Sequence, residues 1–546
     1  MKNIIKLLTG FCISSSLVMS SCIEETFPTN GATEDQIISS DQSASAMLWG
    51  MHAMLNTPVF TVGDYHFDWG YGAMMHIRDI QTNDMPIYAS NYDQFQAWER
   101  NISMGEDYLY NQIVWNFYWR CVLSANKLLA AFPIDKATEI QKGYIGAAYA
   151  YRAMLYLDLA RMYEYLPTDG TKMPNLAGND VTGLTVPIVT ETTTEEQAKN
   201  NPRVTREKMA EFILSDLQAA EKYIVNLTES SHVLPHLDAV YGLMARYYMW
   251  LAEDANGNSD IEAYKNAQKY ARLAITESNL APMTQEECLS TSKGFNNINC
   301  WMWGAQLVKE NDLVQTGIIN WTSWKSNETS FGYAGAYGAQ AMIDASMYNR
   351  IDDNDFRKRL WKAPNGSPLS DKNEYVSSAY MDFSSTVKEY GSLKFRPGEG
   401  NADDVNLTAA TAYPLMRVEE MYFIEAEAAE HVAPGTGKTL LESFMNNYRI
   451  ADDVAEYTYS CTNSNVIDEI VFQKRVELWG EGLTFFDVKR LDMSVTRDYQ
   501  GSNWKSLTNF NTSRRPAWMN YCIVATEKNS NSALVGYENP DPSQAY

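Results

Sequence analysis

The sequence predicts a mostly α-helical protein, a scaffold of paired helices that carries long irregular insertions and short β-strands. Apolar residues recur at helical spacing in six segments, which are residues 141–166, 205–224, 237–251, 261–275, 415–430 and 466–479. Residues 58–101 and 282–412 lack that spacing and are rich in Gly, Ser, Asn, Trp and Tyr. Such a composition is typical of loops and short strands, where binding sites tend to lie.

The first helical block, about residues 102–281, carries the clearest signals. Segment 141–166 is apolar almost all round and stops at Pro167, whereas Thr205 is placed to cap the helix that follows it. Segments 237–251 and 261–275 alternate small and aromatic side chains, which lets two helices pack closely. This pattern is similar to tetratricopeptide helix pairs, although no strict repeat period is visible. A second block covers about residues 413–491.

The chain begins with the features of an export signal. A positively charged start precedes an apolar run that is too short to span a bilayer. Small residues then lead into Cys22, as in a bacterial lipobox, whose cysteine is acylated and becomes the mature N-terminus. We expect residues 1–21 to be a lipoprotein signal peptide and residues 22–546 to form a single domain, anchored to a membrane by the lipid. A plain secretory leader is the alternative.

Charge and cysteine content narrow the possible partners. The formal net charge of -24 repels phosphate backbones, so we expect no nucleic acid, but it does not repel neutral glycans. Cys288 and Cys300 could close a small loop in an oxidising compartment or remain buried free thiols. No zinc-ligand spacing occurs among the cysteines and histidines, so no metal and no cofactor are expected.

The sequence contains no convincing catalytic motif. Residues 434–439 resemble a phosphate-binding loop, but Val432 stands where that loop needs its first glycine. His232 and His236 are four residues apart, yet Pro235 lies between them and no Glu follows His232, which excludes a zinc-protease helix. The 68 Asp and Glu residues make chance glycosidase pairs unavoidable. We therefore expect a binding protein with no catalytic residue, and not an enzyme.

Tryptophan is the positive signal for binding. Trp301 and Trp303 are two residues apart and would face the same way in a strand, and Trp321 and Trp324 follow in the same insertion. Trp98 lies in the other insertion. The flat apolar face of a pyranose stacks on such rings. We expect these five tryptophans to form a glycan-binding platform, which requires both insertions to meet on one face. The alternative is that some of them belong to the core.

Four polar residues of the first insertion could contribute hydrogen bonds to sugar hydroxyls. Asn101 follows Trp98 by three residues, and Arg78, Asn83 and Asp84 follow an aromatic loop at residues 63–72. An ordinary capped loop explains the last three equally well.

Four segments resemble the SusD/RagB-like lipoproteins of Bacteroidetes. They are residues 148–156 (Ala-x-x-x-Arg-Ala-x-x-Tyr), 417–428 (Arg-x-x-Glu to Ala-Glu-Ala), 477–490 (Glu-Leu-Trp-Gly-Glu-Gly to Phe-Asp-Val-Lys-Arg) and, most weakly, 124–126 (Ser-Ala-Asn). The chain departs from the family pattern at Gln473-Lys474 and at Thr484. The charged residues of these motifs are expected to pair at helix interfaces; they are Arg417, Glu420, Glu427, Asp487 and Arg490.

The resemblance implies a protein of the outer-membrane surface, and the acids that follow Cys22 are similar to the surface-export signal of such lipoproteins. It also implies capture of a polysaccharide or oligosaccharide and its delivery to a SusC-like TonB-dependent transporter. A flat row of tryptophans favours an extended β-linked backbone, such as a plant cell-wall β-glucan or xyloglucan. The alternative is a SusD-like binder of peptides or host glycoprotein fragments, for which exposed strand edges are expected.

Overall fold

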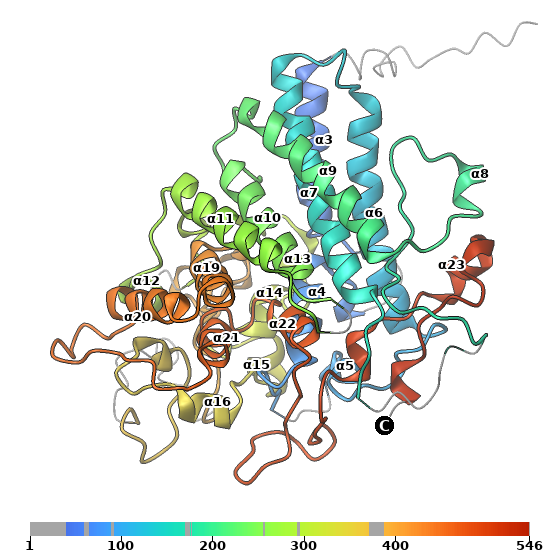
Figure 1. Cartoon of the computed structure of the whole chain (residues 1–546). Coiled ribbons are helices and arrows are strands. Elements are labelled where there is room, and N and C mark those ends of the chain that lie inside the picture. The colour runs from blue at the N-terminus through green and yellow to red at the C-terminus, as the bar shows by residue number, and fades with distance from the viewer. Residues whose placement is uncertain are drawn as a thin grey trace, which may run out of the picture.

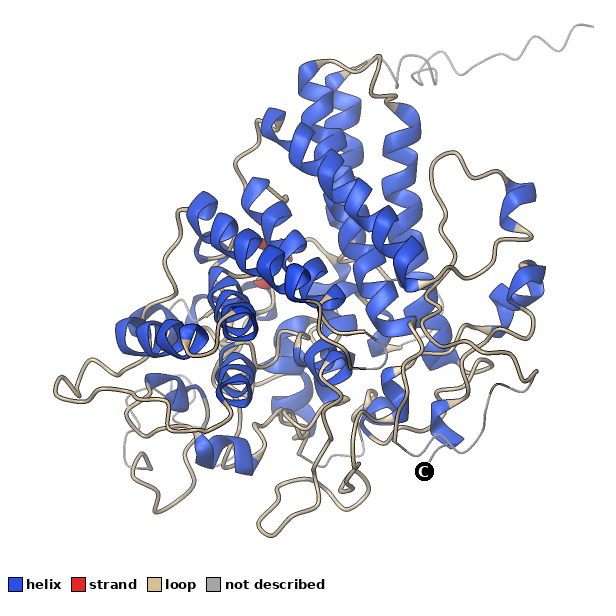
Figure 2. Cartoon of the chain, in the orientation of Figure 1, coloured by secondary structure: helices blue, strands red, loops and turns tan. Residues whose placement is uncertain are grey.

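The computed structural model describes residues 40–58, 65–88, 92–169, 175, 177–254, 257–291, 295–370 and 387–544, and Cys22 lies outside them. Helices dominate this part of the chain (Figures 1 and 2). The one sheet in it has two antiparallel strands, β1 (Trp303–Gln306) and β2 (Ala412–Met416). The predicted fold class, mostly α with short strands, is confirmed.

Ten helices form the scaffold of the described chain. They are α3 (Asp41–Met54), α6 (Leu109–Ala131), α7 (Glu139–Tyr163), α9 (Arg206–Tyr223), α10 (Leu237–Leu251), α11 (Ile261–Ser278), α19 (Val418–Val432), α20 (Thr436–Tyr448), α21 (Val466–Glu477) and α22 (Thr484–Arg490).

The other described helices have at most six residues, except α4, which has 11. They are α4 (Gly70–Ile80), α5 (Gln96–Glu99), α8 (Glu195–Ala198), α12 (Gln285–Leu289), α13 (Asp312–Gln315), α14 (Trp321–Lys325), α15 (Gly332–Tyr337), α16 (Ala345–Arg350), α18 (Val405–Thr408) and α23 (Ala525–Ser530). Single 3-10 turns are η1 (His66–Asp68), η2 (Ile224–Asn226), η3 (Ile298–Cys300), η4 (Phe356–Leu360), η6 (Gly398–Gly400), η7 (Ala517–Met519), η8 (Ser532–Leu534) and η9 (Pro542–Gln544).

Successive scaffold helices pack against one another in chain order. Helix α6 contacts α7, α7 contacts α9, α9 contacts α10, and α10 contacts α11, which in turn packs on α19. Figure 1 shows this series running from the teal helices through green to orange. Because α11 and α19 are neighbours in space, the residues between them are an insertion into the helical series, as the sequence predicted.

Local sequence explains where the main helices begin and how closely they pack. The Thr138 side chain accepts from Gln141 N–H, and the Gln141 side chain accepts from Thr138 N–H, which together cap α7. A Cβ on Gly143 would lie 2.5 Å from the backbone of Asn226, so glycine lets η2 lie directly against α7. Asp260 caps α11, and Asn279 ends it in the left-handed region at φ 52°.

Two boundaries differ from the sequence prediction. Residues 58–101 were expected to be irregular, yet they contain α4, all of whose residues are buried. A helix with no exposed face shows no amphipathic period, so its sequence does not reveal it. Residues 415–430 were expected to be one helix, but β2 occupies the start, and α19 begins at Val418 after Arg417 at its N-cap.

The insertion at residues 282–412 supplies part of the protein core instead of decorating its surface. It consists of short helices, turns and β1, and its apolar residues join those of α4, α6, α7, α10 and α19 in one hydrophobic cluster. A loop segment that enters a core must satisfy its polar backbone and side-chain groups there. Buried ion pairs meet part of that need.

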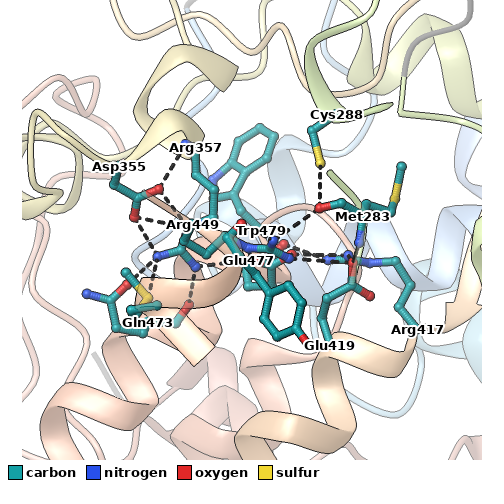
Figure 3. Close-up of polar contacts among 12 residues, drawn as sticks. Met283, Cys288, Asp355, Arg357, Arg417, Glu419, Arg449, Gln473, Glu477 and Trp479 are labelled. Carbon is teal, nitrogen blue, oxygen red and sulfur yellow. Dashed lines mark hydrogen bonds and ion pairs between the residues drawn. The ribbon is translucent and has the colours of Figure 1, made fainter. Parts of the chain in front are cut away.

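The largest of these ion-pair networks centres on Glu477, at the end of α21 (Figure 3). Its carboxylate accepts from Arg449 Nε at 2.7 Å, Arg417 Nη1 at 3.1 Å and Arg357 Nη1 at 3.1 Å. Arg357 belongs to η4 in the insertion, and the other two belong to the scaffold. The network therefore ties the insertion to the helices.

The charges of the family-like motifs pair as expected. Glu420 of α19 binds Arg246 of α10, with 2.6 Å between Oε2 and Nη2. Arg490 of α22 binds Glu427 at 2.6 Å and Asp487 at 2.9 Å. These side chains are buried and join neighbouring helices, so the structural interpretation of the motifs is confirmed.

Candidate functional site

All five tryptophans that were expected to form a platform are buried in the hydrophobic core. Trp301 and Trp303 have no exposed surface, and Trp98, Trp321 and Trp324 are at most 3% exposed. A ring without exposed surface cannot stack on a sugar, so the prediction of an exposed tryptophan platform is wrong. The physical reason is that the insertions fold inward and use their largest apolar side chains to fill the core.

The two insertions nevertheless meet, as the platform hypothesis required. Phe95 links them, because its ring contacts Trp98 at 6.2 Å and Trp324 at 5.2 Å between centroids. Phe67 adds an edge-to-face contact with Trp98 at 5.1 Å. The expected rings thus form the buried foundation of the junction between the insertions, and other side chains form its surface.

The remaining three tryptophans pack elsewhere in the core. Trp321 stacks on Tyr413 of β2 at 5.2 Å, and Trp301 lies against Phe295 at 5.8 Å. Trp303 meets Tyr151 of α7 edge to face at 5.0 Å. It also donates its indole N–H to the carbonyl of Val233.

Three of the four expected polar contact residues, Arg78, Asp84 and Asn101, are also buried, and Asn83 is half-buried. Arg78 lies in α4 and donates to Asp158 Oδ2, Tyr118 Oη and the Gly482 carbonyl. Asp84 accepts from Arg475 Nε at 3.0 Å, and half-buried Asn83 accepts from the same guanidinium at 3.1 Å. These groups stabilise the interior, so the expectation that they face a ligand is wrong.

The Asn101 side chain also bonds the protein's own backbone. It adopts a left-handed conformation with φ 50°, and its amide donates to the Pro542 carbonyl at 3.1 Å. The side chain therefore fixes the C-terminal segment against the turn after α5.

Exposed tyrosines gather where the two insertions meet, and we call Tyr65, Tyr88, Tyr92 and Tyr337 the tyrosine surface. Tyr65, Tyr88 and Tyr337 are 39%, 40% and 42% exposed, and Tyr92 is half-buried. Six aromatic side chains of the described chain are strongly exposed, and these three are half of them. The sequence pointed to the aromatic loop at residues 63–72, which holds Tyr65, but gave no signal for Tyr88 or Tyr337.

Direct contacts hold the tyrosine surface together across the two insertions. The rings of Tyr92 and Tyr337 stack with 3.5 Å between centroids and 4° between planes. Beside them, His66 Nδ1 and Tyr333 Oη are hydrogen-bonded at 2.9 Å. Because Tyr92 and His66 belong to one insertion and Tyr337 and Tyr333 to the other, these contacts hold the two insertions together at this surface.

Tyr88 is fixed by the backbone of the second insertion. Its N–H donates to the Gln340 carbonyl at 2.8 Å, and the neighbouring Ile87 pairs with Ala341. Lys388 Nζ lies 4.8 Å from the centre of the Tyr88 ring, a cation–π contact. A positively charged group therefore borders the tyrosine surface.

The chemistry of this surface suits a ligand that is both flat and hydroxylated. Tyrosine rings offer apolar faces for stacking, and their hydroxyls both donate and accept hydrogen bonds. A backbone held by contacts between insertions loses little conformational freedom on binding, which favours affinity.

The described residues contain no cluster of three or more His, Cys, Asp or Glu side chains that could hold a metal ion. His236 instead bonds the Ser231 carbonyl through Nε2 at 3.2 Å. Cys288 and Cys300 are both free thiols, so the possible disulfide between them is not formed, and burial raises the pKa of each to about 12. No helix within the described ranges combines the length and apolar character needed to cross a membrane.

Two family models match the chain. The model described as "Starch-binding associating with outer membrane" matches residues 69–249, and the SusD family model matches residues 315–545. No curated protein matches it.

Many solved structures share the fold. A SusD-like carbohydrate binding protein from Bacteroides vulgatus is 20% identical, with a TM-score of 0.67 over 90% of this chain and 97% of that one. A SusD superfamily protein from Bacteroides thetaiotaomicron is 17% identical, with a TM-score of 0.65 over 92% and 100%. Surface glycan-binding protein A from Bacteroides uniformis is 14% identical, with a TM-score of 0.60 over 92% and 100%.

The structural likeness extends along nearly all of the chain and shows the shared fold. The two family models match on either side of residues 250–314. Together they include all four segments that carry the sequence resemblance. From these matches we conclude that the chain belongs to the SusD/RagB-like family.

Proposed function

We propose that this protein binds a neutral polysaccharide or oligosaccharide at the tyrosine surface. The observation that carries the proposal is the concentration of exposed aromatic rings at the junction of the two insertions. The descriptions of the matching family model and of the Bacteroides vulgatus and Bacteroides uniformis structures support the ligand class. Burial of a ring face against a sugar contributes about 1–2 kcal/mol.

Single alanine substitutions test this site in affinity gels that contain a panel of polysaccharides. We expect Tyr88→Ala and Tyr337→Ala each to weaken retention about tenfold, which corresponds to about 1.4 kcal/mol. Tyr537→Ala is the matched control, because that tyrosine is 41% exposed but lies in the C-terminal segment. If the control and the two variants behave alike, the tyrosine surface is not the binding site.

The panel must decide which glycan is bound. The preference for an extended β-linked backbone such as a β-glucan or xyloglucan depended on exposed tryptophans, and these are buried. The tyrosine surface favours neither a straight nor a curved glycan. Starch, β-glucan, xyloglucan and mannan are therefore suitable members of the panel.

Peptide binding receives no comparable support. A protein that captures extended peptides presents an open strand edge. In the described ranges the named strands are β1 and β2, which pair with each other and are almost entirely buried. A glycan ligand therefore agrees better with the exposed groups.

We propose that the protein binds without hydrolysing. The tyrosine surface offers stacking faces and hydroxyls, and its neighbour Lys388 is a cation, whereas glycoside hydrolysis uses a pair of carboxyl groups. The purified protein should release no new reducing ends from its preferred polysaccharide over many hours. Turnover that a single Asp or Glu substitution abolishes would place the protein among the hydrolases.

We further propose that a lipid on Cys22 holds the protein at the outer-membrane surface, where it delivers glycan to a SusC-like TonB-dependent transporter. The description of the family model associates the family with the outer membrane, and the lipobox-like sequence supports the anchor. Purification from gently solubilised outer membranes should recover a TonB-dependent transporter in about equal amount. Recovery of the protein alone, under conditions that preserve other membrane complexes, would contradict delivery by direct contact.

A further inference from the structure

A groove of about 600 Å³ lies along the face of α6 that points away from the tyrosine surface. Trp115, Trp119 and Leu123 contribute its helical wall. Their spacing of four residues puts them on one face of the helix. Tyr110, whose ring packs on Phe67 beneath Tyr65, precedes Trp119 by nine residues, which is about half a turn around the helix. The groove is thus separate from the tyrosine surface.

The opposite wall comes from the loop before α9 and from α23. Pro187, Val189 and Asn201 line it on one side, and Glu527 and Asn531 on the other. The groove therefore combines indole and aliphatic surface with amide and carboxylate groups. Its volume lies within the range of about 300–1,000 Å³ that is usual for small-molecule sites.

Hydrogen bonds hold the loop wall in place. The backbone of Val189 is fixed on both sides of the residue. Its N–H donates to Tyr156 Oη at 2.8 Å, and its carbonyl accepts from Tyr156 Oη at 2.8 Å and from Asn126 Nδ2 at 3.0 Å. Asn201 N–H donates to Asn531 Oδ1 at 2.9 Å, and Asn531 Nδ2 donates back to the Asn201 carbonyl at 2.7 Å. The groove is thus formed before any ligand arrives.

We propose that this groove is a second carbohydrate site, which takes a short neutral segment of the same glycan. The ligand class rests on the proposed function. Three observations favour a sugar: the half-buried indole of Trp119 beside the exposed Leu123, amide and carboxylate groups on the facing wall, and a net charge of -24 that disfavours anions. Trp115 is 3% exposed and supports the Trp119 ring from the interior, with 5.3 Å between centroids. The exposed Leu123 extends the apolar floor.

The test uses Leu123→Asp, which places a charge on the apolar floor of the groove. Leu123 is 52% exposed, so its replacement should leave the fold intact. The matched control is Leu507→Asp, because Leu507 is 62% exposed and does not line the groove. Both are compared in wild-type protein and in a protein with Tyr65, Tyr88 and Tyr337 all replaced by alanine. The probes are maltohexaose, cellohexaose and mannohexaose, measured by titration calorimetry.

We expect the triple tyrosine variant to retain weak binding of one hexasaccharide, which Leu123→Asp then reduces at least tenfold and Leu507→Asp does not. If the triple variant binds none of the probes while the wild type binds one of them at a single site, the second site does not exist and the proposed function stands. Residual binding that Leu123→Asp leaves unchanged would also overturn the groove. If the wild type binds neither the probes nor any polysaccharide of the panel, the proposed function itself fails.

Discussion

Replacing Glu477 by glutamine tests whether the buried charge network holds the insertion to the scaffold. The glutamate side chain is 4% exposed and accepts hydrogen bonds from Arg449, Arg417 and Arg357. Glutamine has nearly the same shape but no charge, so three buried guanidinium groups lose an anion. Removing one member of a buried ion pair costs about 3–5 kcal/mol.

Other carboxylates limit the loss to about that range. Arg417 keeps Glu481 at 2.9 Å, and Arg357 keeps Asp355 at 2.6 Å. Urea denaturation at pH 7 measures the free energy of unfolding of wild type and variant. Glu310→Gln is the control, because its pair with Lys309 is exposed and should contribute less than about 1 kcal/mol.

The pH dependence gives the same test a second readout. The guanidinium groups of Arg449, Arg417 and Arg357 outweigh the burial of Glu477 and hold its pKa well below 4.5. The folded protein therefore releases this proton more readily than the unfolded chain, so the stabilisation is complete above pH 4.5 and is lost as the pH falls below it. The difference between wild type and Glu477→Gln should shrink over that acidic range. A variant within about 1 kcal/mol of wild type at pH 7 would refute the reasoning.

Four further predictions follow from burial and from the expected anchor. Trp301→Ala should lower the free energy of unfolding by about 3–5 kcal/mol in urea denaturation, whereas Tyr337→Ala should lower it by no more than about 1.5 kcal/mol, the size of one aromatic stacking contact. Burial raises the pKa of the Glu99 carboxyl to about 7, so the folded state binds this proton more tightly than the unfolded chain does. The resulting stabilisation is present below pH 4.5 and is lost as the pH rises from 4.5 to 7. Glu99→Gln should flatten that part of the plot of unfolding free energy against pH. Cys22→Ala should move the protein from the membrane fraction to the soluble fraction with unchanged glycan affinity. Residues 22–546 should unfold in one calorimetric transition if they form a single domain, and two separate transitions would contradict it.

The sequence predicted the scaffold well because amphipathic helices leave a local pattern. Segments 237–251 and 261–275 agree closely with α10 and α11, and Thr205 caps α9 as expected. Helix α4 was missed because it is buried on every side and therefore has no polar face. The long-range contact between α11 and α19 leaves no local signal, but it explains why residues 282–412 form an insertion.

The candidate site was predicted only in part. The irregular composition of the two insertions correctly indicated segments that meet, yet composition does not tell which rings remain exposed. Trp98 and Trp324 are surrounded by Phe95 and Phe67, and such neighbours favour burial. Tyrosine and tryptophan both carry a polar group on an apolar ring, so residue type alone does not decide which of these rings stay exposed.

The most direct measurement is a crystal structure of the protein with a hexasaccharide from the affinity panel. The account predicts sugar rings within about 4.5 Å of the rings of Tyr88 and Tyr337, with Trp98 and Trp324 still buried beneath them. A sugar stacked on Trp98 or Trp324 in an opened core would contradict it. So would a sugar bound outside both the tyrosine surface and the groove beside α6.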